Sequence, residues 1–449
     1  MKQIEVEIIK QSFGKEGIAY LDGKVVFIPF SLKGDKLLIE IVEDKKDYST
    51  GKIIKIITPS KLRIKPVCPN FSICGGCHYL FTNYSEELEF KDEIIRNFSS
   101  RYNMPEDLIE KTIPSVKELN YRSRINLHIT VSNDQVQLGF YEYSSHKIIN
   151  FEKCFLISDK MNTAIQELKS NLNKNIRFLK KITTTLKEIQ VVEYSNNEII
   201  IAFNIYREYK ELNRDYSEFT RELIKKSSNI SGAFFIDHYK NSFKRRFISG
   251  NIKFYYKIDF KDVTYKFQVT PPSFFQVNLD QINNILKIIY SNLEQFNDAV
   301  LLDIFGGVGL FSLIFGKYFK KVFLMELNRS ALYDAKENLN LQKNTKILSG
   351  KAEKSIKVFR PVDKGKTVAI IDPPRPGLGG KFIKELNRLK IDKIIYISCK
   401  PSTFFRDLDY LSSHYDVKKI QPIDMFPKTY HIEVIGILER KNSSKNSVS

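Results

Sequence analysis

Four of the five cysteines have a spacing that fits a metal centre. Cys68, Cys74 and Cys77 form a C-x5-C-x2-C pattern, and Cys154 lies far downstream in FEKCFL. Zinc sites prefer two short pairs of ligands, whereas iron–sulfur clusters accept three clustered cysteines and a remote fourth. The spacing favours a cluster over zinc, and either metal over four unrelated buried cysteines. A disulfide framework is not expected, because cytosolic thiols are kept reduced.

A second group of reactive residues lies where apolar strands are predicted to end. Asp303 ends AVLLD, Glu326 ends KVFLME, Asp372 ends TVAIID, and Cys399 follows KIIYIS. Ligands of open α/β sheets collect at the carboxyl ends of the strands. These four side chains are therefore expected to line one site.

The turn after the first of these strands indicates which ligand that site takes. DIFGGVGLFSL is not the G-x-G-x-x-G of dinucleotide sites, and no P-loop lysine is present. Acids at successive strand ends suit a cationic nucleoside such as S-adenosylmethionine better than a pyrophosphate, with Glu326 accepting hydrogen bonds from a ribose. The alternative is a turn whose glycines serve only packing.

Cys399 has the surroundings of a nucleophile. It precedes a predicted helix that Ser402 or Thr403 would cap, and Lys400 and Arg406 are near in sequence. A helix N-terminus and basic neighbours lower the pKa of a thiol, so the pattern predicts a usable thiolate. The competing interpretation is a small buried hydrophobic residue.

Two other segments carry polar or aromatic residues in apolar surroundings. Glu433, in FPKTYHIEVIGIL, is an acid inside a predicted apolar strand, where a carboxylate is costly unless it is satisfied or used. His431, on the same strand face, is interpreted as a core histidine. In SFFQVN, Phe274, Phe275 and Gln276 would stack on and hydrogen-bond a base or adenine, or else fill the core.

The chain that positions these groups has 449 residues, 42% of them apolar, with 71 Lys and Arg against 52 Asp and Glu. That length predicts two to four domains and excludes no enzyme class, while the aromatic content excludes a largely disordered chain. The net charge of +19 points to a polyanionic partner, although a Lys- and Asn-rich composition alone produces the same surplus. No membrane span or signal peptide is found, so a cytoplasmic protein with no membrane partner is expected. No obligate protein partner is evident.

The hydrophobic pattern predicts a multidomain chain. Residues 1–58 alternate with period two between turn signals, which predicts an OB-like β-barrel. Residues 59–255 mix strands and helices around the cysteines, as in an α+β domain. Residues 256–440 alternate apolar strands with amphipathic helices, which is typical of an α/β doubly wound sheet. Residues 441–449 are polar and are predicted to be a disordered tail.

Six collinear motifs make the chain resemble a known family. They are CPNFSICGGC with its remote cysteine, SFFQVN, DIFGGVGLFSL with LMELN, DPPRPG, SCKPSTFFRD and FPKTYHIE. The chain resembles the RNA uracil-5-methyltransferases, and specifically the branch that modifies 23S rRNA. That branch joins an N-terminal TRAM domain and a central 4Fe-4S domain to a Rossmann-like class I methyltransferase domain.

The resemblance implies a role for each motif. It implies Cys399 as the nucleophile and Glu433 as the general base. It also implies four cofactor contacts and four cluster ligands: Gln276, Phe305, Glu326 and Asp372 around S-adenosyl-L-methionine, and Cys68, Cys74, Cys77 and Cys154 on the 4Fe-4S cluster.

The chain differs from the family's usual pattern at a few positions, and other functions are kept as alternatives. It usually has Cys where Gly306 stands and commonly His where Lys428 stands, neither a catalytic position; a polar or acidic residue that holds adenine is often found near Lys351. The expected substrate is 23S rRNA, because the family's tRNA branch typically lacks both barrel and cluster. The alternatives are a tRNA uracil-5-methyltransferase, a cytosine-5 RNA methyltransferase and a non-catalytic RNA-binding assembly factor.

Overall fold

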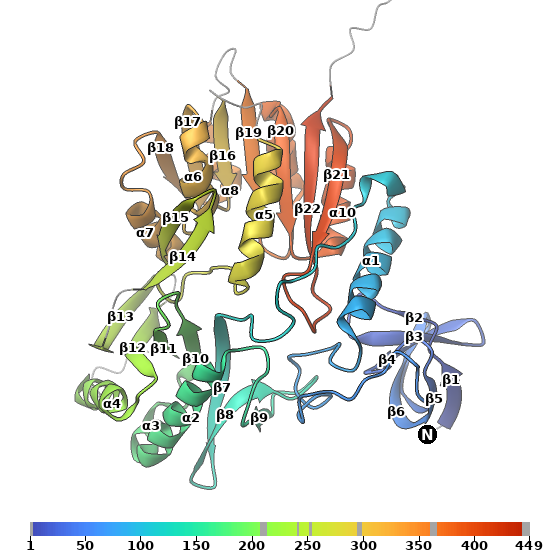
Figure 1. Cartoon of the computed structure of the whole chain (residues 1–449), viewed down its shortest axis with the longest axis vertical. Helices are drawn as coiled ribbons and strands as arrows, with labels where there is room; N and C mark the ends of the chain where they lie inside the picture. Colours follow the sequence, from blue (N-terminus) through green and yellow to red (C-terminus); the bar gives the residue numbers. More distant parts are fainter. Residues whose placement is uncertain are drawn as a thin grey trace, which may run out of the picture.

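The computed structural model describes residues 3–206, 213–239, 242–250, 254–293, 299–359 and 366–441. Three large sheets, one for each successive part of the chain, organise the molecule (Figure 1). Residues 442–449, which make up nearly all of the expected disordered tail, lie outside the described residues. No helix in the described ranges is both long and apolar enough to cross a membrane.

The N-terminal strands form a curled six-stranded sheet in the order β1-β5-β6-β4-β3-β2. Alternating apolar residues such as Ile28, Leu37 and Ile39 point inward and form a small core of their own. The strands are β1 (Gln3–Glu7), β2 (Lys10–Gln11), β3 (Glu16–Leu21), β4 (Lys24–Pro29), β5 (Lys36–Asp44) and β6 (Tyr48–Thr58).

A buried carboxylate ties this sheet to the segment that carries the first three cysteines. Both oxygens of Asp35, a fully buried side chain, accept from the Arg63 guanidinium, at 2.7 and 2.6 Å. The same carboxylate accepts from the backbone N–H groups of Leu32 and Ser60. The chain that leaves the sheet is thereby held in a defined direction.

The central part is a seven-stranded sheet in the order β13-β12-β11-β10-β7-β8-β9, packed against helices α2 to α4. The segments RINLHITVS and QVQLGFY form two adjacent antiparallel strands of it. Its elements are β7 (Arg124–Ser132), β8 (Gln135–Tyr141), β9 (Ile148–Asn150), α2 (Asp159–Lys174), α3 (Ile176–Ile182), β10 (Leu186–Glu193), β11 (Ile199–Ile205), α4 (Asn213–Lys226), β12 (Ile230–Tyr239) and β13 (Ser242–Gly250).

The C-terminal part is a Rossmann-like sheet in the order β18-β17-β16-β19-β20-β22-β21, with helices on both faces. Its first five strands are parallel, and β22 runs antiparallel to both β20 and β21. The strands are β16 (Val300–Ile304), β17 (Lys321–Glu326), β18 (Thr345–Ser349), β19 (Thr367–Ile371), β20 (Lys393–Ser398), β21 (Tyr415–Ile423) and β22 (Glu433–Arg440).

Two further elements precede this sheet, and short helices connect its strands. The hairpin of β14 (Tyr255–Phe260) and β15 (Val263–Gln268) leads to α5 (Leu279–Ser291). The helices between the sheet strands are α6 (Leu310–Phe315), α7 (Arg329–Asn338), α8 (Ala352–Val358), α9 (Gly380–Leu389) and α10 (Pro401–Leu411), with short 3-10 helices at Glu106–Leu108 and Gly316–Tyr318.

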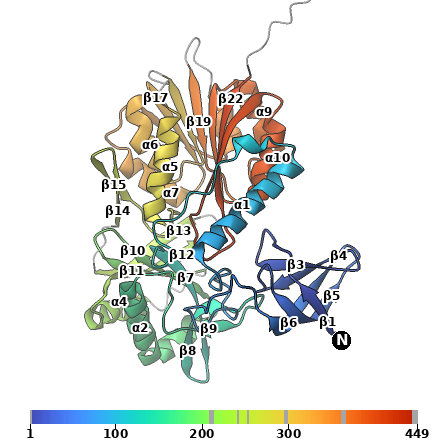
Figure 2. The same cartoon turned by 45° about the vertical axis from the view of Figure 1, so that its right-hand side comes forward.

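One helix from the central part of the sequence crosses to the C-terminal sheet. Helix α1 (Tyr84–Arg101) lies beside α10 (Figure 2). The Phe98 ring of α1 stacks on Phe405 of α10, at 6.2 Å between centroids. Ile94 and Ile95 of α1 join the hydrophobic core beneath β20 and β22. Helix α1 falls within the predicted central domain, residues 59–255, but it packs against the C-terminal sheet and its helix α10.

The structure corrects the expected positions of three residues and adds a strand that was not predicted. Strand β16 continues through Ile304, so Asp303 lies inside the strand rather than at its end. Glu433 is the first residue of β22 rather than an interior residue, and His431 precedes that strand. Strand β18 was not predicted, because its sequence TKILS is short and only partly buried.

We expect Asp35→Asn to loosen the N-terminal sheet. The amide cannot replace a carboxylate that accepts from Arg63 in a bidentate pair, and breaking a buried pair costs about 3 kcal/mol. Hydrogen exchange of the amides of β3 to β5 in the full chain measures this change. Asp44→Asn, which removes an exposed carboxylate of the same sheet, is the matched control. Equal exchange in both variants would contradict the interpretation.

Candidate active site

The register of β20 and β22 brings Cys399 next to Glu433. Ser398, the last residue of β20, pairs with Val434, and Glu433 is the residue before Val434. Cys399 follows Ser398 directly, so the two reactive side chains leave the same edge of the sheet from adjacent strands. Glu433 is only 2% exposed, and Cys399 is half-buried.

Asp372 completes the group from the other side of β20. It follows β19, whose last residue Ile371 pairs with Tyr396 of β20. Burial raises the pKa of Asp372 to about 7, and the nearby carboxyl of Asp303 adds to the effect. Burial also raises the pKa of Glu433 well above its usual range, with Asp372 contributing. Because like charges disfavour each other in a buried site, these carboxyls hold protons near neutral pH.

The sequence-based expectation of a low thiol pKa at Cys399 is wrong for the protein alone. Burial, then the neighbouring Glu433, raises the pKa of Cys399 to about 11, and Arg375 opposes this only partly. Arg406 points elsewhere: its guanidinium pairs with Asp407 at 2.7 Å and donates to the Pro376 carbonyl oxygen. Burial and an adjacent carboxyl therefore outweigh the helix N-terminus.

The start of helix α10 also differs from the expectation. Lys400 is the residue before the helix and Pro401 is its first residue, and no side chain caps it. The Thr403 hydroxyl instead donates to the carbonyl oxygens of Lys400 and Arg375. Thr403 thus connects the DPPRPG turn to the nucleophile's helix.

The glycine-rich turn after β16 is closed by Glu326. Its Oε2 accepts from the Gly307 N–H at 3.0 Å, and its Oε1 accepts from the N–H groups of Leu327 and Asn328. Phe305 and Gly307 both have left-handed φ values, +61° and +54°, which turn the chain away from the strand. Oε2, which accepts only one of these hydrogen bonds, keeps a lone pair for a further donor.

Asp303 does not point into this site. Its carboxylate accepts from the N–H and hydroxyl of Ser312 at 3.0 and 2.6 Å and is 1% exposed. Burial raises its pKa to about 6. The side chain therefore orients helix α6, and it acts on the site through its charge interactions with Asp372 and Glu326.

The segment before α5 carries two adjacent phenylalanines, one exposed and one buried. Phe274 is 67% exposed, whereas Phe275 is 4% exposed and stacks on Tyr256 at 4.9 Å. Gln276 is half-buried beside them. Phe275 therefore fills the core, and Phe274 and Gln276 remain available to a ligand.

Sequence reasoning missed Asp334, which holds this segment in place. Its buried carboxylate accepts from the N–H and hydroxyl of Thr270 at 2.9 and 2.8 Å and from the Ser273 hydroxyl at 2.5 Å. Asp334 lies on the buried face of α7, between Ala331 and Ala335, and an acid among small apolar residues at helical spacing is the signal that could have indicated a buried role.

Cys68, Cys74 and Cys77 line one cavity of about 60 Å³ together with the remote Cys154. Arg122 and apolar side chains complete the lining. Burial raises the thiol pKa of Cys74, Cys77 and Cys154, to about 11 for Cys154. No three His, Cys, Asp or Glu side chains in the described ranges are grouped so as to hold a single metal ion.

His431 lies in the loop before β22, in an aromatic setting. Its ring lies 4.3 Å from the Tyr430 ring and 5.8 Å from the Phe426 ring, and burial lowers its pKa to about 4. His431 is thus neutral and packed against aromatic rings, but it is only partly buried and lies outside the strand, so the expected position in the core of the strand is wrong.

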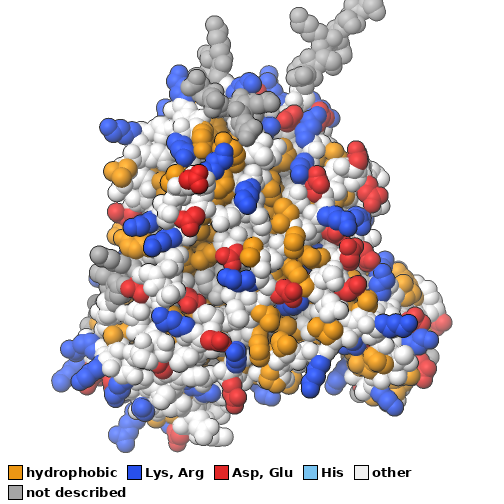
Figure 3. Space-filling model, in the orientation of Figure 1, with side chains coloured by type: hydrophobic (Ala, Val, Ile, Leu, Met, Phe, Trp, Pro, Cys, Tyr) orange, Lys and Arg blue, Asp and Glu red, His pale blue; other side chains and the backbone are white. Residues whose placement is uncertain are grey.

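The positive charge of the chain is not gathered on the face of Figure 1. Figure 3 shows Lys and Arg side chains spread over this face, with Asp and Glu side chains among them. Charge on this face therefore does not mark a path for a polyanion.

Comparison with known proteins identifies relatives along the whole chain. A family model described as tRNA (uracil-5-)-methyltransferase matches residues 83–441, and a TRAM domain model matches residues 2–54. An uncharacterized RNA methyltransferase of Fusobacterium nucleatum is 32% identical, over 98% of this chain and 96% of its own. One of Protochlamydia amoebophila is 31% identical, over 98% of each chain.

A solved structure is similar over nearly the same length. It is the Pyrococcus abyssi tRNA (uracil-54, C5)-methyltransferase in complex with S-adenosyl-L-homocysteine. The two chains are 25% identical, with a TM-score of 0.71, and the match covers 96% of this chain and 99% of that one.

We expect iodoacetamide to alkylate Cys399 slowly at neutral pH and progressively faster in alkali. Only the thiolate reacts, and a pKa of about 11 means that its fraction rises roughly tenfold per pH unit between pH 7 and 9. Mass spectrometry of the Cys399 peptide measures the rate. The same peptide in denatured protein, whose thiol has an ordinary pKa, is the control. A plateau below pH 9 in the folded protein would show a lowered pKa instead.

Proposed function

Because this chain belongs to the tRNA (uracil-5-)-methyltransferase family, we propose that it transfers a methyl group from S-adenosylmethionine to C5 of a uridine in RNA. In this proposal Cys399 is the nucleophile and Glu433 is the general base. The observation that carries it is the pairing of Ser398 with Val434, which sets these two side chains side by side. The chain also has a TRAM domain at residues 2–54.

The chemistry requires both residues. Uracil C5 is a poor nucleophile, so the Cys399 sulfur first bonds to C6, and the displaced electron pair forms an enolate. C5 of the enolate then bonds to the methyl carbon, and the methyl–sulfonium bond breaks to leave S-adenosylhomocysteine. Glu433 accepts the C5 proton, and the bond between C6 and the Cys399 sulfur breaks to restore the thiolate.

The protonation states fit a site that is activated by its substrates. In the protein alone the Cys399 thiol and the buried carboxyls are favoured in their neutral forms. The methyl donor carries a positive sulfonium, and a cation beside Asp372 favours the ionised form of nearby acids. We infer that donor binding increases the fraction of Cys399 that is thiolate.

The residues at the cofactor positions fit such a donor. Glu326 keeps a lone pair on Oε2 for a ribose hydroxyl, and Phe305 presents a partly exposed ring. Among the described residues, no cation lowers the pKa of Asp372, so its carboxyl is available to a positively charged ligand. Gln276 supplies an amide beside them. We propose these four as the S-adenosylmethionine contacts.

A uridine in a stacked helix cannot reach Cys399, so the target must be flipped out or lie in a loop. Phe274, exposed by 67%, is the ring on which we propose that the target base stacks. Stacking on an aromatic ring offsets part of the cost of unstacking the base from its neighbours.

Two RNA classes are candidates for the substrate. The resemblance of the cysteine motif favours 23S rRNA. The Pyrococcus abyssi tRNA (uracil-54, C5)-methyltransferase aligns over 96% of this chain. That coverage includes most of the N-terminal sheet, so the sheet does not distinguish rRNA from tRNA. We therefore keep tRNA as the second candidate.

The cysteine cavity supports a 4Fe-4S cluster rather than a single zinc ion. Zinc requires four ligands about 2.3 Å from one point, whereas cluster cysteines bind different iron atoms around a larger body. A cavity of about 60 Å³ has room for several atoms. We propose Cys68, Cys74, Cys77 and Cys154 as its ligands. The methyl transfer uses no electron from it, so its proposed role is structural.

We expect Cys399→Ala to abolish methyl transfer, because no covalent adduct can form. Glu433→Gln is expected to lower turnover by about 10² to 10⁴, the usual contribution of a general base, and to accumulate protein–RNA adduct. Labelled S-adenosylmethionine, 23S rRNA, bulk tRNA and nucleoside analysis of the product make the measurement. RNA binding by both variants is the control.

The outcome identifies the function. 5-Methyluridine in 23S rRNA supports the first candidate, and 5-methyluridine only in tRNA supports the second. 5-Methylcytidine would overturn the proposal in favour of a cytosine enzyme. No product in either RNA, with RNA binding intact, would favour a binding factor.

We expect anaerobically purified protein to be coloured and to contain roughly four iron atoms per chain. Cys154→Ser should lose most of the iron and of the visible absorption. Cys399→Ala removes a cysteine outside the cavity and should retain both. A colourless protein with one zinc per chain would contradict the cluster.

A further inference from the structure

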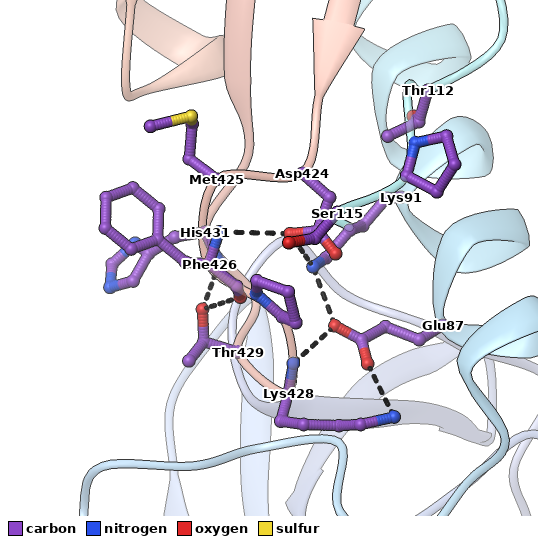
Figure 4. Close-up of polar contacts among 12 residues, drawn as sticks. Glu87, Lys91, Thr112, Ser115, Asp424, Met425, Phe426, Lys428, Thr429 and His431 are labelled. Carbon is purple, nitrogen blue, oxygen red and sulfur yellow. Dashed lines mark hydrogen bonds and ion pairs between the residues drawn. The ribbon is translucent and has the colours of Figure 1, made fainter. Parts of the chain in front are cut away.

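Four charged side chains are buried between helix α1 and the loop of residues 424–432, which leads into β22 and Glu433. Lys91, Glu87 and Asp424 are fully buried, and Lys428 is 5% exposed. Figure 4 shows Lys91 and Glu87 reaching from α1 toward the loop. Burying charges is costly, and an apolar packing of the same volume is often as stable. Such a network therefore needs a reason beyond stability.

One end of the network holds the start of the loop. The Asp424 carboxylate accepts from the Lys91 ammonium at 2.7 Å and from the Tyr84 hydroxyl at 2.9 Å. It also accepts from the N–H of Phe426 at 3.1 Å. Asp424 follows Ile423, the last residue of β21, which pairs with Glu433, the first residue of β22, where the two strands close the loop. The contact with Lys91 is therefore one residue from the pair that places Glu433.

The other end holds the middle of the loop. Glu87, itself paired with Lys91 at 2.7 Å, accepts from the backbone N–H of Lys428 at 2.7 Å. The Lys428 carbonyl oxygen accepts from the N–H groups of His78 and Tyr79, at 2.8 and 3.2 Å. Lys428 has a φ of +64°, a conformation that a non-glycine residue keeps only when its surroundings determine it.

The same helix also braces the nucleophile. Phe98 of α1 stacks on Phe405 of α10, the helix that begins two residues after Cys399. Ile94 and Ile95 share a hydrophobic core with Ile432 and Val434, the two neighbours of Glu433. One rigid helix thus contacts both the element after Cys399 and the loop before Glu433.

We propose that Lys91 is a positioning residue for Glu433, acting through Asp424 and Glu87 to hold the 424–432 loop against helix α1. This inference rests on the proposed function, in which Glu433 is the general base. The ion pairs have direction, which apolar contacts lack, so they determine where the loop stands relative to the helix that braces Cys399.

The test separates the proton-removal step from the steps before it. RNA containing 5-fluorouridine carries no removable proton at C5, so an active enzyme with S-adenosylmethionine stops at the covalent adduct. The adduct rate reports donor binding and Cys399 attack. Turnover on ordinary RNA reports the whole sequence, including proton removal by Glu433.

We expect Asp424→Asn to lower turnover on ordinary RNA by about 10- to 100-fold, the usual consequence of a misplacement near 1 Å. The adduct rate with 5-fluorouridine RNA should stay within about twofold of wild type. [5-²H]Uridine RNA should show a larger isotope effect on turnover in the variant than in wild type. Arg96→Met removes an exposed charge from the same helix and should change none of these values.

Further variants keep the test decisive if one of them folds poorly. Lys91→Met leaves the buried Asp424 carboxylate without a cation, whereas Glu87 keeps its ion pair with Lys428 at 3.5 Å. Lys91→Met with Asp424→Asn is therefore measured beside it, and the double variant should have the higher Tm. Asp424→Asn added to Glu433→Gln should slow turnover no further than Glu433→Gln alone, because residues acting through one group are not additive.

The inference is overturned if turnover and adduct rate fall in parallel, which a merely structural role predicts, or if the Asp424→Asn and Glu433→Gln losses multiply. It is also overturned if Asp424→Asn matches wild type. A wild-type protein that forms neither adduct nor 5-methyluridine refutes the proposed function itself, which is a distinguishable result.

Discussion

The antiparallel pairing of β22 with β20 is the constraint on which the site depends. In a parallel sheet all strand ends on one edge are carboxyl ends, whereas β22 adds the amino end of a strand to that edge. Cys399 therefore meets a residue that begins a strand, Glu433, at the distance of neighbouring strands. Side chains alternate along a strand, so a shift of one residue in this register would turn Glu433 to the opposite face.

Burial sets the electrostatics of this edge. Burial raises the pKa of both Asp372 and Glu433, with Asp303 adding to the first shift and Asp372 to the second, and burial and Glu433 raise the pKa of Cys399. A thiol that is neutral in the free protein is protected from alkylation and oxidation, since both act on the thiolate. In the proposed reaction the positive charge of the methyl donor favours the ionised forms of these groups, which burial in the protein disfavours.

Segments remote in sequence keep this edge in place. Helix α1 packs on α10 through Phe98 and contacts the loop before Glu433 through Lys91. The backbone directly after Cys77 donates to that loop at Lys428, so the cysteine-bearing segment contacts it as well. The Asp35–Arg63 pair connects the same segment to the N-terminal sheet. The three parts of the chain therefore meet around one loop.

The sequence by itself determined the strands and the strand ends from which Asp372 and Cys399 project, because hydrophobic periodicity is local. It also determined the cysteine spacing and the resemblance that the comparisons confirm at the level of the family. Strand β18 was missed because its short sequence has no apolar period. Asp303 was misplaced because its partner Ser312 lies on the next helix.

Only the tertiary structure decided the protonation of Cys399 and the buried charges around α1. Lys91 and Asp424 are 333 residues apart, and each reads as an ordinary surface charge in its own segment. Neighbouring Lys400 and Arg406 suggested a reactive thiolate, but Arg406 pairs with Asp407, and carboxyls from distant strands surround the thiol. A pKa depends on burial and on charges within a few ångströms in space, and sequence distance records neither.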